Sequence, residues 1–287
     1  MPELPEVETI VRDLRPQLEG RLVERAWAGV PGVLRHPDPA SFARRARGRK
    51  LLRVGRHGKF ILIDLDGPPP PGTGDEGARA DELLVIHLGM TGRLGLADPE
   101  APLPIHTHLR LLLSSGAELR MQDYRRFGRV MLGSREELRV ARVLPPLGPE
   151  PYHGRLGFSE FSAILARSRR PVKALLLDQS RLAGLGNIYC DEACFRAGVR
   201  PTAMAARLGP ARRRRLYEGI EAALAAAVDL RGTSIDDYRD GFGEKGQNQH
   251  ALLVYGRAGQ PCVRCGTSLA KTVLAGRTTV YCPRCQR

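Results

Sequence analysis

Four cysteines near the C-terminus constrain the fold more than any other feature of this chain. They form two pairs, Cys262-Val263-Arg264-Cys265 and Cys282-Pro283-Arg284-Cys285, separated by 16 residues. Each pair can direct two thiolates to one tetrahedral ion about 2.3 Å away, and the spacing between the pairs is typical of four-cysteine zinc sites. Because four protein ligands leave no open position, we expect one structural Zn²⁺ ion and a C-terminal zinc finger.

Disulfides are the alternative for these cysteines, but a chain without a secretion signal is expected to keep its thiols reduced. Between the two pairs, Lys271–Val273 and Thr278–Tyr281 are predicted to form a hairpin that presents Arg277 at its turn. Cys190 and Cys194 lie four residues apart in a predicted helix. We expect them to be buried free thiols and not further metal ligands.

The N-terminus begins Met1-Pro2-Glu3-Leu4-Pro5. Removal of Met1 would leave Pro2 with a secondary amine, and α-amino groups titrate near pH 8, so a useful fraction would be unprotonated and nucleophilic. Glu3 is then a candidate proton donor or acceptor beside that amine. In the alternative interpretation, Pro2 only follows the initiator and Pro5 opens a helix, because proline is favoured at the first helical position.

Charge favours a polyanionic partner. The net charge is +14, and the excess of basic over acidic residues is 3 before Pro151 and 11 from Pro151 onward. Nucleic acid fits this excess better than a membrane surface, although Arg212–Arg215 could simply be a solvated surface. No stretch approaches the ~20 apolar residues of a membrane span, and the N-terminus lacks an apolar signal core. We therefore expect a cytoplasmic, nucleoid-associated protein without membrane contact.

The residue pattern predicts an α+β multidomain chain. An amphipathic helix should run from Pro5 to Gly20, because apolar residues recur there at helical spacing. Short strands separated by Gly, Pro and Asp follow it and suggest a β-sandwich. These strands are predicted at Leu22–Trp27, Leu51–Val54, Phe60–Leu65, Leu83–His87, Leu109–Leu113, Glu118–Met121 and Arg129–Leu132.

Proline clusters divide the chain. The Pro- and Gly-rich insertion 67–81 is predicted to be disordered, and the second cluster, Pro145–Pro151, marks a domain boundary. We predict domains at 1–144 (catalytic β-sandwich), 145–250 (helical and DNA-binding) and 251–287 (zinc finger). Helices in the second domain are predicted at Ser159–Arg167, Val172–Leu182, Ile188–Arg196 and Pro210–Leu230.

Several blocks occur together in one order, and their joint pattern closely resembles the bacterial formamidopyrimidine-DNA glycosylases, the 8-oxoguanine repair enzymes. The blocks span most of the chain: Pro2–Thr9, His87–Gly92, Arg125–Gly128, Gly184–Tyr189 and the four zinc-binding cysteines. The resemblance implies an N-terminal β-sandwich with flanking helices, a helix-two-turn-helix domain and a zinc finger. It also implies damaged double-stranded DNA as the substrate and a monomeric enzyme.

The resemblance implies that Pro2 attacks C1′ of the damaged nucleoside, releases the base and leaves an iminium-linked sugar for β- and δ-elimination. Glu3 would protonate the opening sugar and shuttle protons, a task suited to a positioned carboxyl group. Glu6 would support the site, or alternatively would only stabilise the helix N-terminus through the helix dipole. Lys59 and Arg277 complete the implied catalytic set by holding the phosphates around the lesion, together with Asn187.

Extrusion of the damaged base leaves a void in the duplex that side chains must fill. The resemblance assigns this role to Met90, Arg125 and Phe127, with the arginine facing the orphaned cytosine, although Met and Phe among strands are usually core residues. It further implies DNA contacts by His87, Lys173 and Tyr255. For His87 and Tyr255 a structural role is the alternative.

Some positions depart from the family pattern. Tyr124 stands where proline commonly precedes the two arginines, and Cys190 stands where a small residue is common. The loop Asp240–Gln249, the family's lesion-capping element, has Gln247-Asn248 where an aromatic residue is expected. Two other functions remain: a related endonuclease VIII that prefers oxidised pyrimidines, and a non-catalytic zinc-ribbon DNA-binding protein. Leu4 argues against the first, because that class usually has glycine there, and Pro2-Glu3 has no role in the second.

Overall fold

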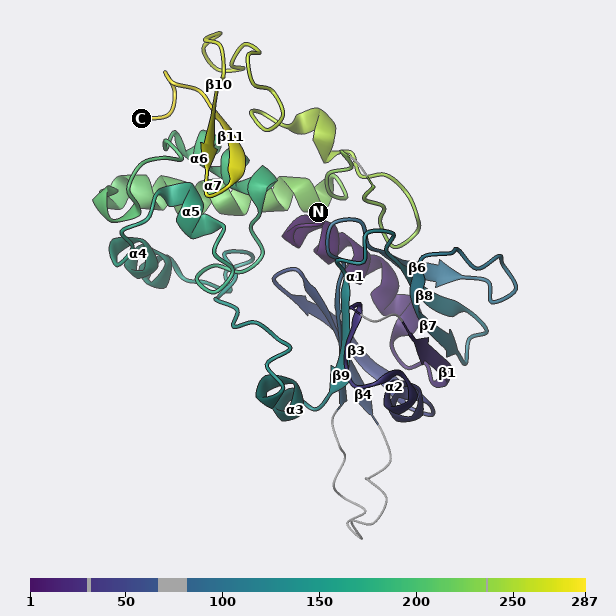
Figure 1. Cartoon of the computed structure of the whole chain (residues 1–287). Coiled ribbons are helices and arrows are strands. Elements are labelled where there is room, and N and C mark those ends of the chain that lie inside the picture. The colour runs from purple at the N-terminus through teal and green to yellow at the C-terminus, as the bar shows by residue number, and fades with distance from the viewer. Residues whose placement is uncertain (30–31, 67–81, 236) are drawn as a thin grey trace. The chain divides into compact units, whose positions relative to one another are not determined.

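The computed structural model describes residues 1–29, 32–66, 82–235 and 237–287, and these form two compact units (Figure 1). The first unit contains Met1–Pro2, Glu6–Pro145 and Thr233–Gly246. The second contains Glu3–Pro5, Pro146–Gly232 and Gln247–Arg287. The predicted insertion 67–81 lies outside the described residues. Among the described helices, none is long and apolar enough to cross a membrane.

The first unit is built on two β-sheets, as the strand pattern predicted. One sheet has four strands in the order β1-β7-β8-β6, and the other has five in the order β2-β9-β5-β4-β3. Every pairing is antiparallel except that of β2 with β9. The strands are β1 (Val23–Ala28), β2 (Leu34–His36), β3 (Lys50–His57), β4 (Phe60–Asp66), β5 (Glu82–His87), β6 (Arg93–Ala97), β7 (Thr107–Leu113), β8 (Glu118–Gln122) and β9 (Arg129–Gly133).

The core of this unit lies between the N-terminal helix α1 (Leu4–Leu18) and the inner faces of both sheets. Val7, Ile10, Val11 and Leu14 are all buried in one cluster with apolar residues of the strands. Their spacing places them on one face of a helix, so burying that face fixes the direction in which the N-terminal peptide leaves the unit. The predicted helix is thus confirmed.

All seven predicted strands are present, and four further elements were missed. Neither β2 nor β6 gave a clear alternating pattern. The strand β2 is only three residues long, and Gly95 breaks the run of side chains in β6. The helices α2 (Pro39–Ala46) and α3 (Arg135–Val140) are short. Both begin at a capping side chain, Asp38 for α2 and Ser134 for α3, which is the local signal that could have located them.

The second unit is helical. It contains α4 (Phe158–Ala166), α5 (Val172–Leu176), α6 (Asn187–Ala197), η1 (Ala205–Arg207), α7 (Pro210–Asp229) and η2 (Asn248–Ala251). The prediction of a helix over Val172–Leu182 was too long. The Asp178 side chain accepts hydrogen bonds from the backbone N–H and hydroxyl of Ser180, and this local turn replaces the next helical turn.

The finger belongs to the second unit. Its strands β10 (Ala270–Leu274) and β11 (Arg277–Tyr281) pair across a two-residue turn in which Ala275 and Gly276 both have positive φ. This conformation suits the twist of a hairpin, and the predicted hairpin is confirmed. Within these two units, the finger groups with the helices, and Thr233–Gly246 groups with the β-sandwich.

Candidate catalytic and DNA-binding site

Glu3 is held as an anion-binding site would hold a ligand. Its side chain is almost fully buried, and its carboxylate accepts backbone N–H groups of Gly186 at 2.8 Å, Ile188 at 3.0 Å and Tyr189 at 3.4 Å. These donors belong to the first turn of α6, where N–H groups have no partner within the helix. The positive end of the helix dipole faces the carboxylate, so the position and orientation of Glu3 are fixed.

The glycines of the Gly184-Leu185-Gly186 block explain how the N-terminal peptide reaches this position. A Cβ atom at Gly186 would overlap the carboxyl group of Glu3, and one at Gly184 would overlap the Leu4 side chain. Gly184 also has φ +103°, a conformation that other residues rarely adopt. The Gly184 carbonyl accepts the Leu4 N–H at 3.0 Å. The two glycines are therefore required for the close approach of Glu3 and Leu4.

Pro2 is buried and Met1 is about half exposed. Glu6 is also buried, and its carboxylate accepts the Thr233 N–H at 2.8 Å, while its backbone carbonyl accepts the Tyr238 hydroxyl at 3.4 Å. Glu6 thus ties the segment Thr233–Gly246 to α1. Whichever role Glu6 has at the site, its contacts in this structure are with that segment.

Lys59 and His87 lie together in the first unit. Lys59 follows Gly58 in the turn between β3 and β4, and the Phe60 and His87 rings are 4.7 Å apart. Burial, followed by the positive charges of Lys59 and Arg129, lowers the pKa of His87 to about 4. His87 is therefore neutral near pH 7. Its Nδ1 accepts the Gly89 N–H at 3.1 Å, which leaves the proton on Nε2 available to donate to an anion.

Asp123 holds the backbone around the predicted void-filling residues, and no motif in the sequence indicated it. Its buried carboxylate accepts the Thr91 hydroxyl, the Arg125 N–H at 3.3 Å and the Gly128 N–H at 2.6 Å. One carboxylate thereby joins the block that carries Met90 to the segment Asp123–Gly128, called here the void-filling loop. A buried polar side chain between two functional blocks is the signal that could have identified it, because such a group must find partners.

The three predicted void-filling side chains are exposed. Met90 is 39% exposed and Phe127 is 51% exposed, and the Arg125 guanidinium lies 4.8 Å from the centre of the Phe127 ring. A Cβ atom at Gly89 would overlap the Phe127 backbone, so the two segments touch through their main chains. The three side chains thus lie outside the core, and their role in filling the void stays a prediction.

The departure at Tyr124 has a partner in this structure. The Tyr124 hydroxyl donates to the Asp237 carboxylate at 2.8 Å, and Arg93 Nε donates to the Asp237 carbonyl at 3.1 Å. Further along the segment, the Asp240 side chain accepts the N–H groups of Phe242 and Glu244. Phe242 is exposed, so the segment before Gln247 does present an aromatic side chain.

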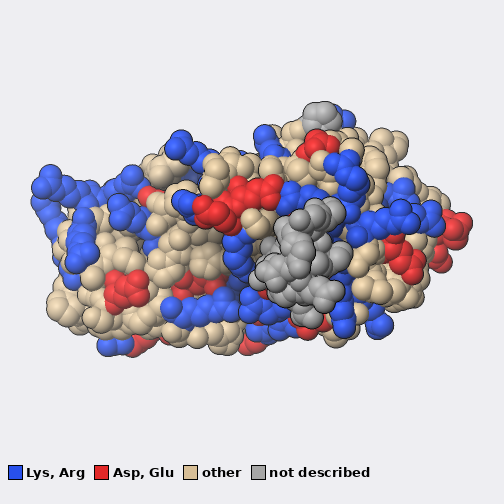
Figure 2. Space-filling model, turned by 90° about the horizontal axis from the view of Figure 1, so that it is seen from below, with Lys and Arg blue, Asp and Glu red and all other residues tan. Residues whose placement is uncertain are grey.

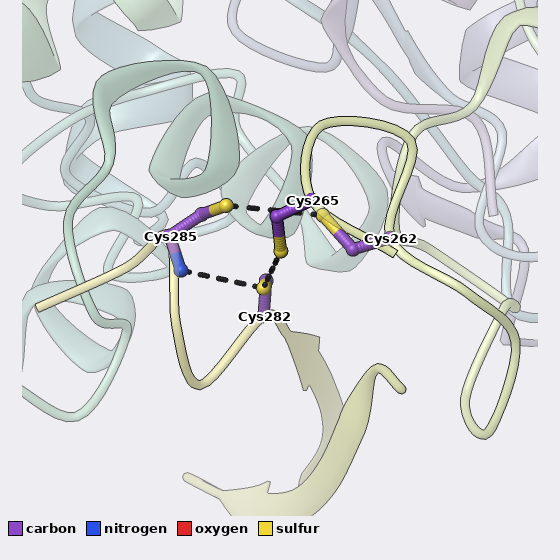
Figure 3. A group of neighbouring side chains, drawn as sticks. All are labelled: Cys262, Cys265, Cys282 and Cys285. Carbon is purple, nitrogen blue, oxygen red and sulfur yellow. Dashed lines mark hydrogen bonds between the residues drawn. The ribbon is translucent and has the colours of Figure 1, made fainter. Parts of the chain in front are cut away.

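The four cysteines of the finger converge as predicted (Figure 3). The Sγ atoms of Cys262 and Cys285 are 3.9 Å apart and those of Cys265 and Cys282 are 3.6 Å apart. A tetrahedral zinc ion with sulfur ligands at 2.3 Å requires separations of about 3.8 Å, so the donor set fits one Zn²⁺ ion. Backbone N–H groups also donate to the sulfurs of Cys262 and Cys282, which stabilises thiolates.

Two acidic residues of α6 hold the finger. The carboxylate of Glu192 accepts the N–H groups of Leu253, Val254 and Tyr255, and Asp191 accepts the Val280 N–H of β11 at 3.0 Å. Arg277 begins the same strand and is exposed. The hairpin that presents Arg277 is therefore fixed to α6.

Lys173 lies in this anchor and not at the surface. Its ammonium group is fully buried, 2.7 Å from the Asp191 carboxylate, and donates to the Thr278 carbonyl at 3.0 Å. A buried ammonium with these partners cannot reach a phosphate, so the structure corrects the predicted DNA contact to a structural contact.

Burial also raises the pKa of the Cys194 thiol, and both Cys190 and Cys194 are buried and free, as predicted.

Asn187 is the first residue of α6, between two residues whose N–H groups bind Glu3. Its Oδ1 atom is buried and has no hydrogen-bond partner among the residues that the structure describes. Tyr255 packs against the core of the second unit while its backbone binds Glu192.

Figure 2 shows Lys and Arg side chains spread over one face of the molecule, with acidic side chains in smaller groups.

Family models match three parts of the chain. Residues 1–130 match the formamidopyrimidine-DNA glycosylase N-terminal domain, residues 147–239 match its helix-two-turn-helix domain, and residues 259–287 match a zinc finger found in these enzymes and in isoleucyl-tRNA synthetase.

Full-length relatives agree. The formamidopyrimidine-DNA glycosylase of Geobacillus kaustophilus is 43% identical over the whole of both chains, and that of Moorella thermoacetica is 45% identical over 94% of each. The crystal structure of the MutM (Fpg) protein of Thermus thermophilus is 42% identical, with a TM-score of 0.84 over 99% of this chain and 98% of that chain. A Lactococcus lactis Fpg mutant, in complex with Fapy-dG-containing DNA, is 31% identical with a TM-score of 0.86 over both full chains.

Proposed function

Since this chain belongs to the formamidopyrimidine-DNA glycosylase family, a family of DNA N-glycosylases, we propose that it excises oxidised purines from duplex DNA and then cleaves the strand by β,δ-elimination. Its substrates would be 8-oxoguanine and formamidopyrimidine lesions. The observation that carries the proposal is the Glu3 carboxylate, fixed at the N-terminus of α6 one residue after Pro2. The DNA complexes of the Lactococcus lactis relative support the substrate class.

In the first step, the secondary amine of Pro2, formed by removal of Met1, attacks C1′ of the damaged nucleoside. The C1′–N bond breaks and the base leaves with its bonding electrons and a proton. The sugar ring then opens to an iminium ion linked to the proline nitrogen. Because a proline amine is secondary, this iminium forms with a positive charge and without loss of a further N–H proton.

Glu3 is proposed to move the protons of this sequence. It would donate to the sugar ring oxygen as the ring opens and later remove a proton from the sugar to start the β-elimination of the 3′ phosphate. The 5′ phosphate leaves in the δ-elimination that follows. Proton transfer needs a carboxyl group held at hydrogen-bond distance from the reacting atoms, and the N–H groups of α6 restrict Glu3 to one orientation.

The remaining residues are proposed to hold and deform the DNA. Lys59, neutral His87 and Asn187 would contact phosphates near the lesion, and the finger would add Arg277. Met90, Arg125 and Phe127 would occupy the space that the extruded nucleotide leaves, which offsets the loss of base stacking. Zinc would have a structural role only, because its four ligands are all cysteines.

The nucleophile is tested by its covalent adduct. Mass spectrometry of active protein should find a chain that begins at Pro2, and borohydride should trap a protein-DNA adduct through that nitrogen. Pro2→Gly keeps only a primary amine with altered geometry and should be severely impaired. A fully active protein that retains Met1, or an adduct at an internal lysine such as Lys59, would refute the mechanism.

The position of Glu3 is tested by two matched glycine variants. Gly186→Ala should displace the Glu3 carboxylate, whereas Gly209→Ala changes the N-cap of α7, where an added Cβ atom meets nothing within 4 Å. We expect Gly186→Ala to lose lesion excision and Gly209→Ala to keep it. Glu3→Gln should also lose base release yet cleave a pre-formed abasic site more nearly like wild type, because the open aldehyde needs no base release.

The lesion class needs a side-by-side assay. Nicking of duplexes that contain 8-oxoguanine opposite C or thymine glycol separates a purine enzyme from an endonuclease VIII-like enzyme. We expect the 8-oxoguanine duplex to be the better substrate. A protein that binds both duplexes but forms no borohydride adduct on abasic DNA would instead be a non-catalytic zinc-ribbon protein.

A further inference from the structure

The void-filling loop contains a tight turn whose second residue is Tyr124. The turn runs from Asp123 to Arg126 and is closed by the Arg126 N–H, which donates to the Asp123 carbonyl at 3.2 Å. Proline is favoured at the second position of such a turn because its ring pre-sets φ, and proline is also what the family pattern commonly has there. The tyrosine of this chain lacks that local restraint, but its hydroxyl can bind a distant partner.

That partner is Asp237, which lies 113 positions further along the chain. The Tyr124 hydroxyl donates to one oxygen of the Asp237 carboxylate at 2.8 Å. Arg93 of β6 binds the same residue, because its Nε donates to the Asp237 carbonyl at 3.1 Å and a terminal nitrogen lies 3.9 Å from the other carboxylate oxygen. Asp237 is therefore held both by the sheet and by the void-filling loop.

Asp237 begins a segment that is also fixed to α1. This segment, Asp237–Gly246, is called here the bridging segment. The Tyr238 hydroxyl donates to the Glu6 carbonyl at 3.4 Å, and the Gly241 N–H donates to the Asp13 carboxylate at 3.0 Å. A Cβ atom at Gly241 would overlap the Asp13 side chain, so the bridging segment lies directly against the helix.

The bridging segment joins two parts of the molecule that act on opposite strands in the proposed function. Its first residue binds the turn that carries Arg125, the side chain proposed to face the orphaned base. Its middle binds α1, which begins at Leu4, two residues after the proposed nucleophile Pro2. Hydrogen bonds between packed segments carry a displacement of one to the other, and a shift of about 1 Å at reacting groups can slow a reaction about 100-fold.

We propose that Tyr124 is a positioning residue that couples recognition of the base opposite the lesion to excision of the damaged base. The inference rests on the proposed function, because it takes Arg125 to contact the orphaned base and Pro2 to be the nucleophile. When Arg125 binds that base, the turn and the bridging segment hold α1 in the position for attack. When the base is missing, the turn shifts, the Tyr124 hydroxyl moves Asp237 with it, and excision slows.

The coupling is measured as a ratio of two excision rates. Single-turnover release of 8-oxoguanine is followed opposite cytosine and opposite tetrahydrofuran, a sugar that offers Arg125 no base. Wild type should react faster on the cytosine duplex. Tyr124→Phe should lower the ratio of the two rates about fivefold, the order expected for one partly exposed hydrogen bond. Its affinity for the cytosine duplex should be unchanged, because the hydroxyl binds Asp237 and not DNA.

Tyr124→Pro separates the contact with Asp237 from the rigidity of the turn. This variant gains the restraint of proline and loses the hydroxyl, so its rate ratio should fall as in Tyr124→Phe. In an Asp237→Ala background, Tyr124→Phe should have no further effect on the ratio, because the acceptor is already gone.

A rate ratio in Tyr124→Phe equal to that of wild type would overturn the inference. So would the wild-type ratio in Tyr124→Pro, because Tyr124 would then only shape the turn, or equal rates of wild type on the two duplexes. The final yield of borohydride trapping on a pre-formed abasic site reports the proposed function separately. Wild type that is not trapped would refute the nucleophile, whereas full trapping with an unchanged ratio would refute only the coupling.

Discussion

The void-filling loop of the first unit and the finger of the second both present exposed side chains on turns, but they are held in different ways. The loop depends on a single buried carboxylate, that of Asp123, which gathers one hydroxyl and two N–H groups. The finger is held by Glu192 and by Asp191 with Lys173, and its own fold depends on four thiolates that fit a zinc ion.

The difference matches two needs: the void-filling loop requires precise placement of its side chains, and the finger requires stabilisation of its fold. Residues that enter a duplex must be placed to within a fraction of an ångström, and one rigid carboxylate between two main-chain segments does this in a small space. The finger is too small to bury a large core: its cluster contains Phe195 of α6, Val254, Leu269, Val280 and two cysteines. A metal and several separate anchors supply the stability that so small a core cannot provide.

The largest effect is expected from removing a zinc ligand. Cys265→Ser should lose the metal and unfold the finger, because binding of structural zinc supplies about 10–16 kcal/mol of apparent folding free energy in isolated fingers. Arg277 then has no fixed position, and specific DNA affinity should fall by two orders of magnitude or more, as about 3 kcal/mol would give. Metal analysis and binding assays measure both.

The neighbouring exposed residue provides the control. Val263→Ala changes the same segment without touching a ligand and should keep its zinc and its DNA affinity. Purified active wild-type protein that contains no zinc would contradict the assignment.

The next largest effect is expected from removing the Asp123 carboxylate, which holds the void-filling loop. Asp123→Ala leaves the buried Thr91 hydroxyl and Gly128 N–H without their acceptor, which costs about 1–3 kcal/mol for each group. The void-filling loop should shift, and excision of 8-oxoguanine from a duplex should fall about 100-fold. Nicking of a pre-formed abasic site should fall far less, because that substrate has no damaged base to extrude.

Asp98→Ala is the control for loss of a loop carboxylate. Among the residues that the structure describes, its side chain accepts only the local Glu100 N–H, and both activities should stay near wild type. A melting temperature for Asp123→Ala far below that of wild type, with equal loss of both activities, would indicate global unfolding. Asp123 would then serve overall stability, as the zinc ligands do, and not the precise placement of the void-filling loop.

The sequence predicted the main parts of this molecule because their signals are local. Helix α1, seven strands, the finger hairpin and the four zinc ligands each follow from spacing or from turn residues within a short segment. Local signals also misled where a side chain interrupts a pattern, as Asp178 does at the end of α5.

Partners distant in sequence could not be predicted in this way. Asp123 meets Thr91 over 32 positions, and Lys173 meets the finger over 105 positions. A lysine in a basic chain suggests a phosphate contact, and only the tertiary structure shows that this one is buried against Asp191. The roles of Pro2, Lys59, Asn187 and Arg277 stay predictions, because each depends on a DNA substrate.

A smaller effect is expected from the void-filling side chains taken one at a time. Arg125→Ala and Phe127→Ala each remove one exposed group and leave the Asp123 contacts in place, so each should lose less lesion excision than Asp123→Ala, about tenfold to 50-fold. Both should retain much of the nicking on abasic DNA. If either variant lost both activities equally, a folding defect would be the cause. The Asp123 contacts would then no longer explain why Asp123→Ala has the larger effect.

The smallest effect is a pH dependence that separates the two regions. His87 has a pKa of about 4 in the folded protein, lowered by burial and then by Lys59 and Arg129, against about 6.5 when unfolded. Between these values the unfolded chain binds a proton that the folded chain does not. The stability contribution of neutral His87 is therefore complete above pH 6.5 and is lost as the pH falls towards 4.

His87→Gln should flatten the pH dependence of unfolding of the β-sandwich between pH 6.5 and 4, measured by denaturant titration. Acid release of zinc should be unchanged in this variant, because it depends on protonation of the thiolates in the other region. An equally steep loss of stability in wild type and variant would show that His87 is not the titrating group. A change in zinc release would show that the two regions are not independent.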